Sequence, residues 1–275
     1  AGTRAWAGNR RAQAGAGIVV ALAAFCFLGP LFYHTNQVKV NLGSATLPPG
    51  PGHPLGTDGD GYDVLGRLMI GGQSSLELGF AVSIATTVLG ALYGAIAGWA
   101  GGIVDSVMMR IVDTVLALPT LVLLILLVTV VTTPNLPMII LLLTALSWLA
   151  IARLVRGEVL ALRTREYVQA ARTMGSGQWR IMLRHLMPNA FAVIVVSATF
   201  TIADAILTLS VLSFLGLGLP PPAADWGSML TDGLNYLFDG YWWMVYPPAI
   251  ILIITLIAFN LIGEAARDAL DVRLR

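Results

Sequence analysis

The sequence of 275 residues contains one lysine, one cysteine and three histidines, and this scarcity excludes several kinds of active site. A phosphate-binding loop needs a Gly-Lys-Ser/Thr sequence. The single lysine, Lys39, follows Val38, so the chain is not a P-loop ATPase. One cysteine, Cys26, excludes an internal disulfide framework and every multi-cysteine metal site. No His-Glu-x-x-His pair and no Gly-x-Ser-x-Gly elbow occurs. The sequence therefore predicts a chain that is not an enzyme and holds no metal.

Charge is also scarce. Charged residues make up only 11% of the sequence, whereas hydrophobic residues make up 57%. The mean hydropathy of +0.80 is far above that of soluble proteins, whose surfaces need charge. A net charge of +1 gives no electrostatic basis for binding nucleic acid. The composition therefore predicts an integral membrane protein that is surrounded by membrane lipid.

Six segments are long and apolar enough to cross a bilayer, which takes about 20 helical residues. They are residues 14–33, 78–99, 114–131, 136–151, 189–217 and 246–262. The sequence predicts an all-α polytopic membrane protein with six transmembrane helices. Its transmembrane domain covers residues 14–262, between tails at 1–13 and 263–275. Pro119, in the third segment, removes a backbone donor and predicts a kink.

The distribution of Arg and Lys predicts the orientation of these spans. If the amino terminus is inside, all but Lys39 and Arg67 of the 16 basic residues face the cytoplasm. Cytoplasmic loops of membrane proteins carry such an excess of positive charge. We therefore expect two cytoplasmic termini, outer loops at 34–77 and 218–245, and a cytoplasmic loop at 156–188.

The predicted loop at 156–188 is rich in arginine and has helical periodicity. Four residues before Gly175 and four after it recur at i, i+3, i+4 and i+7, so each set lies on one face of a helix. These residues are Tyr167, Ala170, Ala171 and Met174, then Trp179, Met182, Leu183 and Leu186. The pattern predicts two short amphipathic helices, hinged at Gly175, that present a small alanine surface to another protein. The alternative is a solvated connector with no partner.

Two features within the predicted spans are candidates for helix packing and transport. Glycines at four-residue intervals let a neighbouring helix approach closely, either within the chain or from a partner. They are Gly90, Gly94, Gly98 and Gly102. Asp204 lies about 22 Å along the fifth predicted span, since a helix rises 1.5 Å per residue. An ionisable side chain at that depth faces protein or water. Asp204 therefore either lines a translocation path or is a hydrogen-bonded structural residue.

Further motif residues lie in and around the glycine-hinged loop. They are Glu166, the pair Ala170-Ala171, Gly175 and the closing His185-x-x-Pro188-Asn189. This pattern resembles the EAA loop of permease subunits in bacterial ATP-binding-cassette (ABC) importers. Segments at 53–68, 212–230 and 260–273 are similar to peptide-type permeases. The resemblance covers nearly the whole chain after the amino-terminal tail. It points to the "C" member of the dipeptide/oligopeptide/nickel permease family.

The resemblance implies the type I ABC-importer permease fold and several partner proteins. A homologous permease subunit would complete the path, and two ABC ATPase subunits would bind ATP and Mg. An extracytoplasmic substrate-binding protein would deliver the cargo. This chain would itself bind no cofactor and would lie in the bacterial plasma membrane. The residues implied in ATPase coupling are Glu166, Tyr167, Ala170, Ala171, Met174, Gly175, Ile181, His185 and Pro188.

The sequence leaves the cargo open. Short peptides are the leading hypothesis, and nickel chelates, glutathione-like compounds and opines are alternatives. Tyr62, Gln178 and Leu209 depart from the family pattern, and the first and last of these concern the substrate class. Two other protein classes are also considered. One is an ion-coupled secondary carrier with Asp204 as the coupling acid, although no internal repeat is visible. The other is a membrane scaffold that moves no cargo.

Overall fold

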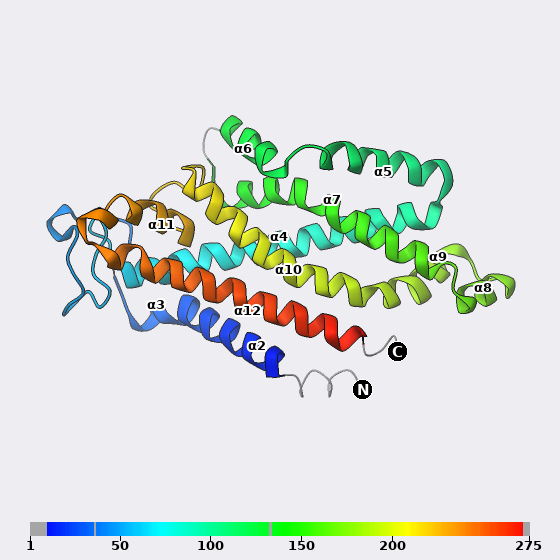
Figure 1. Ribbon diagram of the computed structural model, residues 1–275, viewed down its shortest axis with the longest axis horizontal. Coiled ribbons are helices and arrows are strands. Elements are labelled where there is room, and N and C mark those ends of the chain that lie inside the picture. The colour runs from blue at the N-terminus through cyan, green and yellow to red at the C-terminus, as the bar shows by residue number, and fades with distance from the viewer. Residues whose placement is uncertain (1–9, 36, 132–133, 272–275) are drawn as a thin grey trace.

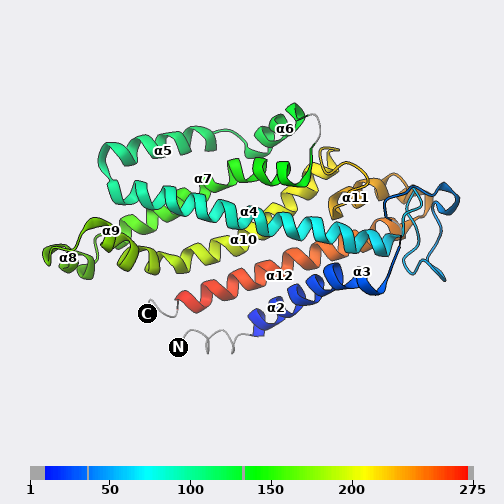
Figure 2. The same ribbon diagram turned by 180° about the vertical axis from the view of Figure 1, so that it is seen from behind.

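The computed structural model describes residues 10–35, 37–131 and 134–271, and every named element in them is a helix. Five of these helices are long and apolar enough to span a membrane, or six if a bent pair counts as one span. The long helices run beside one another along the long axis of the molecule (Figure 1), as the view from behind also shows (Figure 2). The predicted all-α membrane fold is therefore confirmed.

The first candidate span, Arg10–Phe32, comprises α2 (Arg10–Ala23), a π-helical turn and α3 (Gly29–Phe32). The remaining helices are α4 (Val64–Ala100), α5 (Gly102–Leu116), α6 (Thr120–Val130), α7 (Leu136–Leu162), α8 (Glu166–Thr173), α9 (Gln178–Ile181), α10 (Met187–Phe214), α11 (Trp226–Leu234) and α12 (Tyr246–Asp271). Because α8 and α11 lie at opposite ends of the bundle (Figure 1), we name these the α8 end and the α11 end.

Helix α4 begins at Val64, whereas the sequence predicted a loop up to residue 77 and a span from residue 78. The carboxylate of Asp63 caps this helix by accepting a hydrogen bond from the N–H of Gly66 at 2.8 Å. Polar residues in the first turns of α4 suggested a loop, but distant segments satisfy them. Arg67 donates to the carbonyl of Pro222 at 2.7 Å, for example. A prediction from hydropathy alone therefore placed the start of this helix too late.

The third predicted span, 114–131, is not one straight helix. The structure has two helices, α5 and α6, bent by 79° at the break between them. Pro119 is the N-cap residue of α6, in agreement with its missing backbone donor. Charged residues made the start of α5 look like a loop. In the structure, however, Asp105 forms a bidentate ion pair with Arg156 of α7, with N–O distances of 2.5 and 2.6 Å.

The remaining helices also extend beyond their predicted boundaries. Helix α7 continues to Leu162, beyond the predicted end at residue 151. Helix α9 runs through a π-helical turn, Met182–Leu186, directly into α10, so no loop separates them at residue 188. Helix α12 continues to Asp271 and includes most of the predicted tail at 263–275. Residues 1–9 of the predicted amino-terminal tail lie outside the described residues.

Helices α4 and α7 pack closely through the predicted glycines. A Cβ atom added to Gly90 or Gly98 would come within 2.7–2.9 Å of a backbone oxygen of α7, and Gly94 lies even closer to the oxygen of Ala152. These contacts leave no room for a side chain. Gly102 is not part of this contact, because α4 ends at Ala100. Gly102 begins α5 with φ +55°, and an added Cβ would meet nothing within 4 Å.

Candidate functional site

The α8 end is formed by a hairpin of α8 and α9 that turns at Gly175. The N–H of Ser176 donates to the carbonyl of Ala171 at 3.0 Å, and that of Gly175 donates to Arg172 at 2.9 Å. This pair of bonds ends α8 in a Schellman motif, whose turning residue has a left-handed conformation. Gly175 has φ +78°, so a residue with a side chain would be strained there. The turn therefore depends on glycine.

The inner face of the hairpin is packed against the helical bundle. Val168 and Ile181 are fully or almost fully buried in a cluster with side chains from α4, α7 and α10. The guanidinium of Arg172 lies 4.8 Å from the ring centroid of Trp99, near the end of α4. Such a cation–π contact stabilises by about 0.5–1 kcal/mol at an exposed site. The hairpin is thus anchored both by buried apolar side chains and by this cation–π contact.

Ala171 belongs to this buried face, with only 3% of its surface exposed. The sequence placed Ala171 beside Ala170 in a surface that docks a partner. In the structure Ala170 is exposed and Ala171 packs against the chain's own helices. Helical spacing placed Ala171 on one face with Tyr167, Ala170 and Met174, but in the structure only Ala171 of these four is buried against the bundle.

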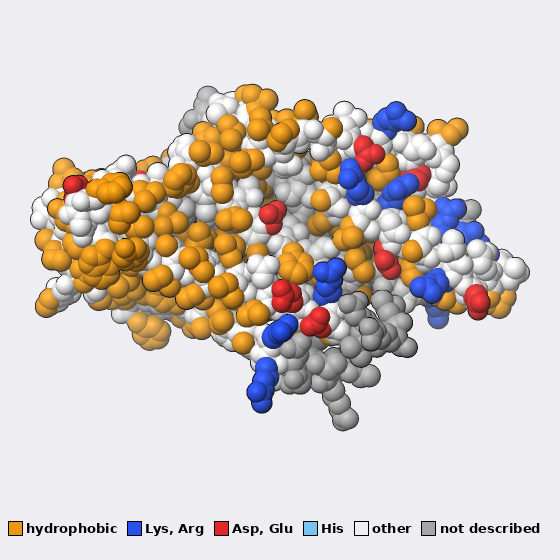
Figure 3. Space-filling model, viewed as in Figure 1, with side chains coloured by type: hydrophobic (Ala, Val, Ile, Leu, Met, Phe, Trp, Pro, Cys, Tyr) orange, Lys and Arg blue, Asp and Glu red, His pale blue; other side chains and the backbone are white. Residues whose placement is uncertain are grey.

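The outer face of the hairpin exposes large apolar side chains. Met174 is 79% exposed and Trp179 is 68% exposed. Tyr167 and Leu183 are also exposed large hydrophobic residues, and Glu166, Ala170 and Pro188 lie on the surface. The side chains of Gln178 and His185 lie outside the described part of the structure. Arg and Lys side chains gather toward this end of the molecule, whereas the other end is largely hydrophobic (Figure 3). Apolar groups exposed within such a polar surface are typical of a protein interface.

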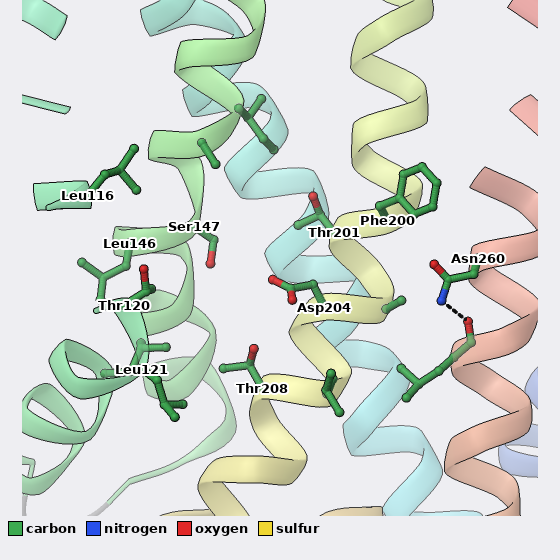
Figure 4. A pocket seen from close by; sticks show the side chains of 16 residues that line it. Leu116, Thr120, Leu121, Leu146, Ser147, Phe200, Thr201, Asp204, Thr208 and Asn260 are labelled. Atoms are coloured by element: carbon green, nitrogen blue, oxygen red, sulfur yellow. Dashed lines mark hydrogen bonds between the residues drawn. The ribbon is translucent and has the colours of Figure 1, made fainter. Parts of the chain in front are cut away.

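A second candidate site is a cavity of about 690 Å³ between the break of α5 and α6 and the helices α7, α10 and α12. Its polar lining residues are Thr120, Ser147, Thr201, Asp204, Thr208 and Asn260. Asp204 points from α10 into the space between α10 and α7, between Thr201 and Thr208 (Figure 4). The volume is within the range of small-molecule sites. The structure therefore brings Asp204 to the wall of a cavity, as a path-lining residue requires.

Comparison with known proteins shows which family these features belong to. Residues 90–275 match the family described as "Binding-protein-dependent transport system inner membrane component". The dipeptide transport system permease protein DppC of Bacillus subtilis (strain 168) is 40% identical over 267 residues. This match covers 97% of this chain and 83% of that protein. The chain belongs to this permease family.

Other relatives of the permease agree with that assignment. The oligopeptide transport system permease protein OppC of Bacillus subtilis (strain 168) is 40% identical, covering 97% of this chain and 87% of that protein. The probable D,D-dipeptide transport system permease protein DdpC of Escherichia coli (strain K12) is 34% identical, and the match covers 92% of this chain and 85% of that protein. The predicted relationship to peptide-type "C" permeases of ABC importers is therefore confirmed. The relatives are transport components of the inner membrane.

A solved structure supports the fold of the permease independently. A chain of the methionine ABC transporter MetNI, in inward-facing conformations, superposes with a TM-score of 0.53 at 20% identity. The match covers 76% of this chain and 97% of that chain. This similarity confirms the ABC-importer permease fold.

At the α11 end, two of the segments that resemble peptide-type permeases contact each other. The indole N–H of Trp226 donates to the carbonyl of Leu68 at 3.0 Å. The Arg67 guanidinium, which also bonds Pro222, lies 4.1 Å from the ring centroid of Tyr62. Residues near 62–68 and 222–226 therefore form one structural unit. Both motifs are visible in the sequence, but their contact is visible only in the structure.

Two aspartates organise this unit by capping helices. Asp225 caps α11 by accepting hydrogen bonds from the N–H groups of Gly227 and Ser228, at 2.8 and 3.1 Å. Burial raises the pKa of Asp225, and hydrogen bonds from Ser228, Ser213 and Gly227 partly offset that effect. Asp63 caps α4 in the same way, and its second oxygen lies 2.8 Å from Nδ1 of His53. Both carboxylates thus stabilise the fold through their hydrogen bonds.

Proposed function

We propose that this permease is one half of the membrane path of an ATP-driven importer. A homologous permease subunit forms the other half, and two ATPase subunits bind ATP and Mg below them. The chain has no catalytic step of its own in this proposal. Its task is to transmit ATPase movement to the helices that surround the cargo.

The hairpin at the α8 end is the observation that carries this proposal. A coupling element needs an outer surface that binds the ATPase and an inner surface that moves with the bundle. Met174 and Trp179 supply exposed apolar area on the outside. Val168 and Arg172 fix the inside to α4 and its neighbours. A loop without such anchoring would move independently and lose the ATPase movement. Exposed Glu166, in the first turn of α8, is available to pair with a basic group of the ATPase.

The distribution of charge supports an orientation in which the α8 end faces the cytoplasm. Arg and Lys gather toward that end (Figure 3), and positive charge is enriched in cytoplasmic segments of membrane proteins. Both termini are then cytoplasmic, and the α11 end faces the outside. A substrate-binding protein would deliver cargo at the α11 end.

Relatives support peptides as the cargo class. Both Bacillus subtilis relatives have names that refer to peptide transport, one to dipeptides and one to oligopeptides. The cavity of about 690 Å³ is large enough for a small molecule and has both hydroxyl and apolar groups in its lining. We therefore propose di- and oligopeptides as the transported compounds.

The experiment compares two glycines of the same hairpin. Gly175→Val places a β-branched residue at φ +78°, where such residues are conformational outliers. Gly177→Val is the control, because its φ is not left-handed and an added Cβ meets nothing within 4 Å. We expect Gly175→Val to lose ATPase co-purification and peptide uptake while the protein still inserts into the membrane. Gly177→Val should keep both. If Gly175→Val retains its ATPase subunits and transports normally, the hairpin is not the docking element.

A further inference from the structure

Asp204 has an unusual position for a carboxylate. It lies within α10, a candidate membrane-spanning helix, and its side chain is exposed to the cavity. Among the described residues, no hydrogen bond or ion pair satisfies this carboxylate. Asp105 of α5, by contrast, is paired with Arg156 of α7. An ionisable group in the hydrocarbon core normally faces protein partners or a water-filled space. Asp204 is therefore not explained as a structural residue of this chain.

The lining around Asp204 has a definite chemical character. Thr201, Asp204 and Thr208 are spaced at i, i+3 and i+7, so one face of α10 carries a carboxylate between two hydroxyls. Ser147 lies across the cavity on α7 (Figure 4). The described lining contains no Lys, Arg or His. One negative charge with neighbouring hydroxyl acceptors and no competing cation suits a ligand that carries a positive charge.

The hydroxyls add directional acceptors to this charge. An ammonium group has three N–H donors and no acceptor, so it needs several oxygen atoms around it. The hydroxyl of Thr201 donates within α10, to the carbonyl of Ser197 at 2.8 Å, which leaves its oxygen able to accept. Asn260 donates its amide N–H to Leu256 at 2.9 Å, which leaves its amide oxygen able to accept as well. Thr201 and Asn260 therefore each offer an acceptor oxygen at the wall of the cavity.

We propose that Asp204 is a binding site for the ammonium group of the cargo as it passes through the permease. This inference rests on the proposed function and deepens it, because it names the charge that the path selects. The ammonium has two possible sources, the α-amino group of a peptide and the side chain of a lysyl residue. The chemistry of recognition is the same for both.

The test uses the complete importer, with its permease partner, ATPases and binding protein, in proteoliposomes. Uptake of three free tripeptides, Ala-Lys-Ala, Ala-norleucine-Ala and Ala-Glu-Ala, is compared between wild type and Asp204→Asn. If the lysyl side chain is bound, the Asn variant loses uptake of the lysyl peptide by roughly tenfold relative to the other two, since a hydrogen bond to a charged group is strong. If the α-amino group is bound, all three fall by a similar factor. Asp239→Asn, which removes an exposed carboxylate at the α11 end, should change none of them.

A chemical rescue separates binding from general damage. Asp204→Cys is made in a Cys26→Ala background, so position 204 carries the only thiol of this chain. A carboxyethyl methanethiosulfonate restores a negative charge there, and a propyl methanethiosulfonate adds a neutral group of similar length. We expect only the carboxylate adduct to recover uptake. Equal recovery with both adducts, no recovery with either, or wild-type uptake by Asp204→Asn would overturn the role of Asp204. If wild type transports none of the peptides, the proposed cargo is wrong and the ammonium site is wrong with it.

Discussion

Two tryptophans at the α11 end, Trp226 and Trp243, have surroundings opposite to those of Trp179 at the α8 end. At the α11 end, the indole N–H groups of Trp226 and Trp243 donate to carbonyls of Leu68 and Thr57, at 3.0 and 3.1 Å, and both side chains are buried. At the α8 end, Trp179 is 68% exposed. A buried indole that has its hydrogen bond contributes to the fold of its own chain. An exposed indole contributes nothing comparable until another protein covers it.

Three charged residues at the α11 end differ from Glu166 at the α8 end in the same way. Asp63 and Asp225 cap helices at the α11 end, and Arg67 bonds a carbonyl 155 residues further along the chain. At the α8 end, Glu166 lies on the surface at the first turn of α8. These charged side chains of the α11 end are thus bonded within this chain, although that end also exposes apolar side chains such as Phe238. At the α8 end, the inner face of the hairpin is packed against the bundle, and its outer face exposes apolar side chains, as a subunit interface requires.

Replacing tryptophan by alanine at each end should give the largest difference in stability between two variants. Trp226→Ala removes a fully buried side chain and should destabilise the permease by about 3–5 kcal/mol. Trp179→Ala should change stability by less than about 0.5 kcal/mol, because the side chain is mostly exposed, yet it should weaken ATPase binding. Thermal unfolding of the purified chain and co-purification of the ATPase subunits measure the two effects. Similar stability losses in both variants would contradict the distinction between the ends.

A second pair of variants tests the helices that connect the ends. Gly94→Ala places a Cβ against the carbonyl of Ala152 and should force α4 away from α7, which costs about 1–3 kcal/mol. Gly157→Ala on α7 is the matched control, since an added Cβ there meets nothing within 4 Å. Alanine is the better helix former, so this control should gain up to about 1 kcal/mol. Opposite signs for the same substitution in unfolding measurements would support the close contact. Equal effects would show that backbone propensity alone is being measured.

The sequence predicted the hairpin better than it predicted the helix boundaries. The turn at Gly175 follows from a local rule, because its left-handed conformation favours glycine. The start of α4 depends on distant partners, such as the contact between Arg67 and Pro222. A hydropathy pattern cannot show that a charged residue will find such a partner, and this is why the loop at 34–77 was predicted too long.

The candidate site shows the same limit. Helical spacing grouped Ala170 and Ala171, but only the packed structure shows that the second is covered by the chain itself. The contact of Arg172 with Trp99 was missed, because residues 73 positions apart give no local signal. The depth of Asp204 could be predicted from its position along a span. Its cavity could not, since that space depends on the 79° bend between α5 and α6.

The smallest predicted effect concerns how tightly the hairpin is held. Arg172→Gln removes the charge over the Trp99 ring, an interaction of about 0.5–1 kcal/mol at an exposed site. Local opening of α8 should therefore become roughly two- to fivefold more frequent, and hydrogen exchange of its backbone amides should accelerate by the same factor. Arg180→Gln is the control, because Arg180 is exposed on α9. Unchanged exchange in Arg172→Gln would mean that the buried residues alone anchor the hairpin. A much larger acceleration would mean that its base is less rigid than a coupling element requires.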